Sequence, residues 1–263
     1  MMQLLSVNIG QEQSILNAKS LGKTGIYKVP VTGPVSITRD GIAGDAILDT
    51  KNHGGVDQAI YIYGAPDYAW WSQELGQQLS PGTFGENLTV AGLESARFAI
   101  GDRLHVGTVI LEVTAPRIPC VTLASRMGDP QFVKHFRAAE RPGLYCRVIQ
   151  EGSLQALDQV TLEPCAVETV PLIEIFRAFY EPHLDEATLR RHLAAPISIR
   201  DRVDKEKQLA NLNPLPGPRH QFRAVIEDPG GGGAYVTVPF DVEQVFGTKR
   251  VKIKATIDGE PYR

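Results

Sequence analysis

Short apolar runs separated by turn residues fill the first 165 positions of the chain, and this pattern is typical of β-strands. An amphipathic helix is expected from Pro66-Asp67 to about Gly76, and two short helices are expected between Val121 and Ala139. Many short strands with few helices predict a barrel or a sandwich rather than a doubly wound sheet. The expected strands are 2–9, one or two over 26–38, 59–63, 88–90, a hairpin over 103–114 turning at Gly107, 144–149 and 159–162.

The hydrophobic period changes from two to three or four at Val170, which predicts helices. Asp185 is a plausible N-cap for the second of them. A proline- and glycine-rich stretch then indicates a linker, and a β pattern too short for an independent barrel follows it. The expected helices are 171–180, 185–193, 197–210 and, after the linker, 242–246.

These patterns define the expected architecture. The fold class is mainly β or α+β, with a β-barrel or sandwich, a small three-helix appendage and a partial β-rich C-terminal segment. The expected domains are 1–165, 170–212 and 220–263.

Composition narrows the classes of function. The chain has 263 residues, of which 43% are hydrophobic, and a formal net charge of −3. No broad basic surface is therefore expected. The chain is accordingly not expected to bind nucleic acid or an anionic membrane. No apolar run is long enough to cross a membrane, and no signal-peptide pattern is visible. Three irregularly spaced cysteines argue against a disulfide framework and favour a reducing, cytoplasmic setting.

Cys120 is the most informative residue of the chain. It follows an apolar strand in a loop that Pro116 and Pro119 stiffen, and Arg117 supplies a positive charge beside it. A cation favours the thiolate form, which is either a nucleophile or a soft metal ligand. A small buried hydrophobic side chain is the simpler interpretation of a lone cysteine.

Several glycine-rich turns carry polar residues. The turns at 40–45 and 51–57 expose backbone amides that can form a nest for an anion, although a tight loop between strands explains each of them alone. Asp45, His53 and Asp57 match no defensible metal-ligand spacing, and no CxxC or HExxH pair suggests zinc. Two further turns lie at 84–88 and 100–102.

Taken together and in order, these motifs resemble the MOSC domain, the family named after the C-terminal part of molybdenum cofactor sulfurase. The helices that follow, with Ile199-Arg-Asp-Arg-Val203, are similar to the three-helix domain of the bacterial stand-alone branch, which includes N-hydroxylaminopurine reductases. The segment from Phe222 to Gly259 resembles the first half of a small bacterial β-barrel domain of unknown function. The matching motifs are Asp40-Gly41, Gly44-Asp45, His53-Gly54-Gly55, Asp57, Ala59, Gly85-Glu86-Asn87-Leu88, Ile100-Gly101-Asp102, Pro116-Arg117 and Pro119-Cys120.

The resemblance implies a β-barrel that binds the molybdenum cofactor, with Cys120 as the molybdenum ligand. We expect Cys120, Arg117 and the His53 turn to line one pocket, and Cys146 and Cys165 to be structural. The expected proton donor is His53 or Asp57, so the candidate catalytic residues are Cys120, His53 and Asp57. The candidate cofactor-binding residues are Lys51, His53, Gly54, Gly55, Glu86, Asn87 and Arg117.

The resemblance favours a molybdenum-dependent reductase of N-hydroxylated bases or related N–OH compounds. An external electron-donor reductase is expected, because the chain shows no flavin or iron–sulfur motif. One alternative is a cofactor-binding or persulfide-carrying module without catalysis. Another is a cysteine hydrolase that pairs Cys120 with His53, His105 or His135, although no ordered catalytic signature surrounds the thiol.

Overall fold

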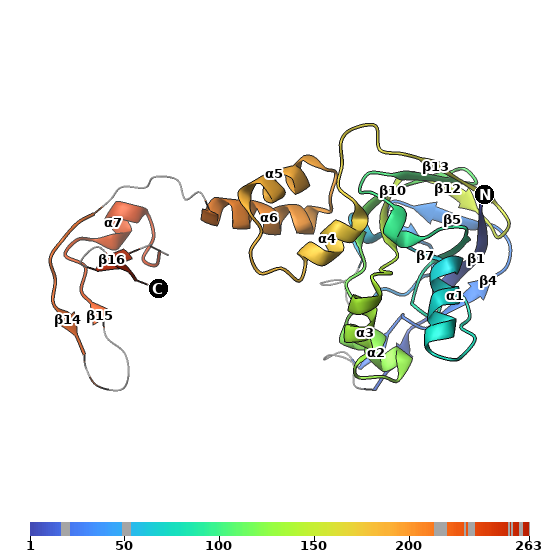
Figure 1. The fold of residues 1–263 in the computed structure, drawn as a ribbon, viewed down its shortest axis with the longest axis horizontal. Coiled ribbons are helices and arrows are strands. Elements are labelled where there is room, and N and C mark those ends of the chain that lie inside the picture. The colour runs from blue at the N-terminus through green and yellow to red at the C-terminus, as the bar shows by residue number, and fades with distance from the viewer. Residues whose placement is uncertain are drawn as a thin grey trace. The chain divides into compact units, whose positions relative to one another are not determined.

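The chain forms two compact units, Met1–Asn213 and Pro214–Arg263. The structure is a computed structural model, drawn in Figure 1. Lys51 and His53 lie outside the residues it describes, so nothing below tests their predicted roles. The described residues are 1–16, 22–48, 54–212, 220–228, 230, 235–251, 253, 255–257 and 260–262.

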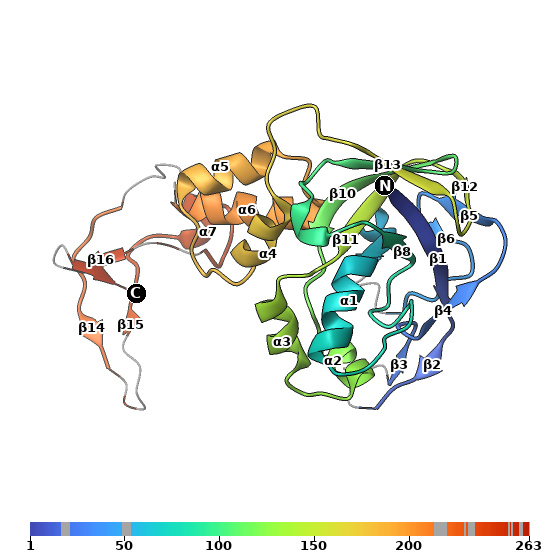
Figure 2. The same ribbon diagram turned by 45° about the vertical axis from the view of Figure 1, so that its right-hand side comes forward.

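A closed barrel of seven strands forms the centre of the first unit (Figure 2). Its strand order is β13-β9-β10-β11-β7-β8-β1, and pairing of β1 with β13 closes it. Only the β7–β8 pair is parallel among these neighbours, so the barrel is mixed. The predicted barrel is confirmed. The strands are β1 (Met2–Gly10), β7 (Ile60–Gly64), β8 (Leu88–Ala91), β9 (Arg103–Val106), β10 (Val109–Pro116), β11 (Leu144–Gln150) and β13 (Gln159–Glu163).

Alternation along β7 divides the apolar side chains between two cores. Ile60 and Ile62 belong to the cluster inside the barrel, whereas Tyr61 and Tyr63 belong to a second, largely aromatic cluster. This follows from the two-residue period of a strand, in which successive side chains point to opposite faces. The second cluster is therefore built on the outer face of the barrel.

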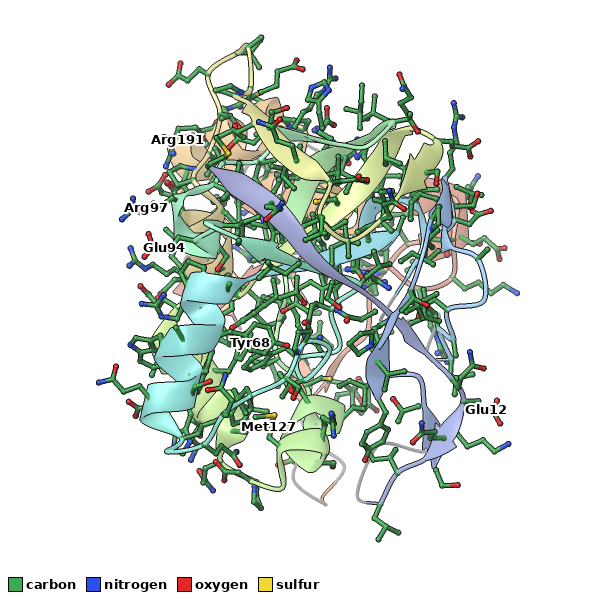
Figure 3. The ribbon with its side chains drawn as sticks, turned by 90° about the vertical axis from the view of Figure 1, so that its right-hand side faces the viewer. Glu12, Tyr68, Glu94, Arg97, Met127 and Arg191 are labelled. Carbon is green, nitrogen blue, oxygen red and sulfur yellow. The ribbon has the colours of Figure 1, made fainter. Side chains whose placement is uncertain are left out.

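Three helices cover the aromatic cluster: α1 (Ala65–Glu74), α2 (Val121–Met127) and α3 (Phe132–Ala139). Figure 2 shows them grouped beside the barrel. Trp71 of α1 is buried, and its ring centroid lies 5.0 Å from that of Phe132 and 5.8 Å from that of Phe84. Tyr68 also belongs to the cluster, and Met127 packs against it (Figure 3).

Short strands complete the first unit. β4 (Lys28–Val31) extends the barrel sheet beyond β1, and β5 (Val35–Thr38) pairs with both β6 (Gly41–Ile42) and β12 (Gly152–Leu154). β2 (Gln13–Ser14) pairs with β3 (Lys23–Thr24). Two or three residues are too few to produce a recognisable alternation, and β2, β3 and β12 were not predicted.

Three helices follow the barrel: α4 (Leu172–Ala178), α5 (Glu186–Ala194) and α6 (Ile199–Leu212). As predicted, Asp185 caps α5, and its side chain accepts a hydrogen bond from the Thr188 amide at 2.7 Å. The amide of Leu172 donates to the Phe98 carbonyl at 2.8 Å, which ties α4 to the barrel. These helices belong to the same compact unit as the barrel.

The second unit contains two small hairpins and one helix. No described side chain of this unit is buried, which fits a segment too small to enclose a core of its own. The strands are shorter than the sequence pattern suggested. The elements are β14 (Ile226–Glu227), β15 (Tyr235–Val236), α7 (Val242–Phe246), β16 (Ala255–Ile257) and β17 (Glu260–Tyr262).

Candidate functional site

Cys120 lies in the loop between strand β10 of the barrel and helix α2. β10 ends at Pro116, and Cys120 is the residue before α2, whose Ala124 amide donates to the Cys120 carbonyl at 3.1 Å. Its side chain is partly exposed and packs against the aromatic cluster. Cys120 is therefore a half-buried residue supported by packed side chains.

Arg117 lies beside Cys120 but is only 4% exposed. Its Nη1 donates to the Phe84 carbonyl at 2.6 Å, and its guanidinium lies 5.0 Å from the centre of the Tyr61 ring. Burial opposes the charge, but Tyr145, Tyr61 and Cys120 together raise the pKa of Arg117 above its ordinary value. Arg117 therefore stays charged and favours the thiolate form of Cys120.

This burial changes the expected task of Arg117. We expected a residue that attracts an anion at the pocket, whereas the structure shows a cation enclosed in an aromatic cluster. Gly85 is part of this enclosure, because a Cβ there would lie 2.8 Å from Ile26 and 3.5 Å from Arg117 Nη1. The glycine also has a φ of +73°, which other residues rarely adopt.

Glu86 is completely buried and accepts several hydrogen bonds. Its Oε1 lies 2.7 Å from the Tyr68 hydroxyl, 2.6 Å from the Gly82 amide and 2.8 Å from Thr89 Oγ1. Burial raises the pKa of Glu86 in spite of these donors. Glu86 thus organises the interior of the site, and direct contact with a cofactor stays a prediction.

Asn87 and Asp45 connect two of the predicted motifs. Asn87 accepts a bond from the Tyr61 amide at 3.1 Å and donates to Asp45 Oδ2 at 2.8 Å. Asp45 also accepts from the Gly10 amide at 2.8 Å and from Lys28 Nζ. Desolvation lowers the pKa of the buried Lys28. Loop structure therefore accounts for both turns, and cofactor binding by Asn87 stays a prediction.

Asp57 holds the start of α6 against the barrel. Its Oδ2 accepts the Ile199 amide at 2.6 Å, and its Oδ1 lies 3.0 Å from Arg147 Nη2. Both carboxylate oxygens are thus engaged in docking the helix. Proton donation by Asp57 stays a prediction that these bonds do not support.

Gly54 and Gly55 form a left-handed turn, with φ values of 80° and 81°. A Cβ on Gly54 would lie 3.0 Å from Ile47, whereas one on Gly55 would meet nothing within 4 Å. Both positions therefore favour glycine because of their backbone conformation, and Gly55 also borders open space. The predicted role of this turn in binding an anion stays a prediction.

Tyr145 and Arg200 were missed by sequence reasoning. Tyr145 lies opposite Ala115 and Tyr61 in the barrel register, with its ring centre 4.9 Å from that of Tyr61. Burial raises the pKa of Tyr145, Arg117 and Arg200 act to lower it, and Cys120 acts to raise it. Tyr145 therefore has two arginines and the candidate thiol as neighbours, an arrangement that depends on strand register and helix docking.

Cys146 and the two described candidate histidines have neighbours of their own. Cys146 is buried in the barrel core, where desolvation and Glu112 raise its thiol pKa. His105 bonds to Glu163 at 2.6 Å, and His135 lies 3.0 Å from Asp129. Among the described residues, no three His, Cys, Asp or Glu side chains gather to hold a metal. The hydrolase alternative therefore gains no support from His105 or His135.

Comparisons with known proteins identify the family to which the mixed barrel and the Cys120 loop belong. The model of the MOSC domain matches residues 49–161, and a domain of unknown function (DUF1905) matches residues 222–263. The uncharacterized protein YflK of Bacillus subtilis is 38% identical over 149 residues, covering 57% of this chain and 67% of YflK. The chain belongs to the MOSC family.

Two further likenesses extend this result. A crystal structure of YiiM from Geobacillus stearothermophilus superimposes with a TM-score of 0.67 and 28% identity, covering 80% of this chain and all of that one. A protein of Gibberella moniliformis described as a reductase is 32% identical over 143 residues. That match covers 53% of this chain but only 25% of the larger protein.

The described residues contain no helix long and apolar enough to cross a membrane.

The residues around Cys120 fit the cofactor that this family is associated with. Cys120 is a half-buried residue with a soft sulfur, which suits molybdenum. Arg117 supplies a positive charge next to it, and its buried Nε has no partner among the described residues. Among the described residues, the groups that would hold the cofactor here are thus a single thiol and a neighbouring cation.

Proposed function

We propose that the protein is a molybdenum-cofactor-dependent reductase of N-hydroxylated bases or related N–OH compounds. The observation that carries the proposal is the half-buried Cys120 beside the buried, charged Arg117 in a MOSC barrel. Similarity to the Gibberella moniliformis reductase favours redox chemistry over a non-catalytic carrier.

In this proposal the cofactor, when bound, supplies the electron-transfer chemistry at the substrate N–O bond. Cys120 ligates the molybdenum, and Arg117 keeps the sulfur in its thiolate form. The Gly54-Gly55 turn, with Lys51 and His53, binds the pterin phosphate through backbone amides and positive charge. The buried network of Glu86, Tyr68 and Gly82 holds the loop that precedes Asn87.

The reaction consumes two electrons and two protons: the N–O bond breaks, one proton goes to the nitrogen, and the other converts the departing hydroxyl to water. The sequence carries no flavin or iron–sulfur motif. We therefore propose that a separate reductase, carrying reduced flavin or an iron–sulfur cluster, supplies the electrons. The substrate is a small molecule, and the cytoplasm is the proposed location.

The test measures molybdenum content and N-hydroxylaminopurine turnover on the same samples, from a host that makes the cofactor. Wild type should contain molybdenum and turn over with a donor, while Cys120→Ser should lose at least a hundredfold in turnover, since a hydroxyl is a poor ligand for soft metals. Cys165→Ser is the matched control and should behave as wild type. Activity without molybdenum would contradict the proposal, and sulfane sulfur on Cys120 without turnover would favour the carrier.

A further inference from the structure

We propose that Arg200, in the first turn of α6, binds a phosphate group of the ligand held at the Cys120 site. The helical segment would then select which ligands the barrel site accepts. This inference rests on the proposed function for the identity of the ligand, but its central test does not require turnover.

The start of α6 is fixed to the barrel beside the site. The Ile199 amide donates to Asp57 Oδ2 at 2.6 Å, and the preceding Ser198 amide donates to the Thr114 carbonyl at 3.1 Å. Arg147 secures the Asp57 carboxylate and also donates to the Ile197 carbonyl at 3.2 Å. Arg200 therefore comes directly after a segment that is hydrogen-bonded to the barrel, and these bonds determine where its backbone lies.

The same bonds lead to the wall of the site. Thr114 Oγ1 lies 2.5 Å from the Asp57 carbonyl and 3.1 Å from the carbonyl of Tyr145. The Tyr145 ring packs on Tyr61, whose other neighbour is the Arg117 guanidinium. The positive charges of Arg117 and Arg200 both act to lower the pKa of Tyr145. Arg200 thus follows two residues, Ser198 and Ile199, that bond to the barrel next to Tyr145 and the Cys120 site.

The two arginines differ in what they can bind. Arg117 is buried and donates to the Phe84 carbonyl, whereas Arg200 is exposed. A guanidinium presents planar donors that match phosphate oxygens in pairs, and positive charge from a second arginine nearby strengthens the attraction. Arg200 is thus the arginine of this pair that a phosphate can approach from solvent.

Two ligands could bring such a phosphate: the pterin cofactor through its terminal phosphate, or a substrate at the nucleotide level. Their shared chemistry is a phosphate monoester. If the cofactor supplies it, Arg200→Gln should lower molybdenum retention. If the substrate supplies it, molybdenum content should stay constant, while the KM for the N-hydroxylated nucleotide rises and that for the free base does not.

The central test uses the full chain purified without cofactor. Alkylation of Cys120 by iodoacetamide is followed by peptide mass spectrometry while inorganic phosphate is titrated at constant ionic strength. Phosphate should slow alkylation of the wild type. In Arg200→Gln the phosphate concentration that halves the alkylation rate should rise about tenfold, as expected for a lost charge-assisted contact. For Arg200→Lys this concentration should lie between those of Arg200→Gln and wild type.

Arg190→Gln is the matched control, because it removes the same charge from α5, where Arg190 bonds to Glu186 at the surface. It should be protected like wild type. Equal protection of Arg200→Gln and wild type, or no protection of wild type, would overturn the inference. Because this arm needs neither molybdenum nor substrate, its failure is distinct from failure of the proposed reaction.

Discussion

Arg117 lies between the aromatic cluster and the Cys120 loop, where its charge is opposed by burial and supported by its neighbours. The proline and arginine around a lone cysteine were enough to predict a site here. The sequence could not reveal that Arg117 is enclosed, because Phe84 and Tyr61 reach it from distant segments. For the same reason Tyr145 and Arg200 were not expected.

Replacing Arg117 should therefore cost folding stability as well as cofactor binding. Arg117→Ala loses a buried charge-assisted hydrogen bond and its packing, so the free energy of unfolding in urea should fall by about 3 kcal/mol. Arg126→Ala, which removes a guanidinium 4.7 Å from the Tyr27 ring, should cost about 1 kcal/mol. Equal losses in the two variants would show that Arg117 is not held as described.

Glu86 makes stability depend on pH. Its folded-state pKa is raised above the ordinary value of 4.5, mainly by burial, so the folded state binds the proton more tightly than the unfolded state. The contribution of protonated Glu86 to the free energy of unfolding is complete below pH 4.5. It is lost as pH rises, by at most about 1.4 kcal/mol per pH unit. Glu86→Gln should thus gain stability relative to wild type between pH 5 and 8 in urea titrations. Glu140→Gln should show the opposite trend, because its hydrogen bond to Arg177 lowers the pKa of Glu140; the same trend in both variants would refute this account.

Alternation and helical periodicity predicted most elements of the first unit, because its strands face a core on at least one side and its helices cover one. The Ile60–Tyr63 run is an example. Neighbouring residues alternate between two clusters, but all four are hydrophobic, so their pattern did not show which face of the strand lies inside the barrel. Glu86 and Asn87 were expected to bind cofactor because they recur in a motif. Their buried hydrogen bonds give the motif a structural role in the loop, and cofactor contact by either residue stays a prediction.

Glu174 joins α4 to α5 by bonding Arg191 and His192. The Arg191 hydrogen bond is the main reason that the pKa of Glu174 is lowered from 4.5. The resulting stability is present above pH 4.5 and is lost as pH falls through the folded-state pKa. Glu174→Gln should cost about 1 kcal/mol at pH 7, and the difference should shrink in acid.

Glu186→Gln provides the comparison for this clamp, because Glu186 pairs with Arg190 of the same helix, α5. Such an exposed pair should contribute less than about 0.5 kcal/mol. Thermal unfolding of both variants at pH 7 and pH 3.5 checks the prediction. A loss for Glu174→Gln that is independent of pH would contradict an ionic clamp.

At the scale of the whole molecule, the two units differ in how they bury their side chains. The barrel closes on itself through the pairing of β1 with β13, whereas no described side chain of the second unit is buried. Hydrogen exchange should therefore find the slowest amides in β10 and β11 and fast exchange in β14, β15 and α7. Comparable protection in both units would show that the second unit has a core that its described residues do not reveal.

The central claim is that Cys120 ligates molybdenum in a MOSC barrel, and X-ray absorption at the molybdenum edge tests it most directly. Protein purified with its cofactor should show one sulfur scatterer more in wild type and in Cys165→Ser than in Cys120→Ser at equal molybdenum content. If Cys120→Ser loses the metal altogether, Cys120→Ala reconstituted with cofactor serves for the comparison. An identical sulfur shell in wild type and the Cys120 variant would contradict the account.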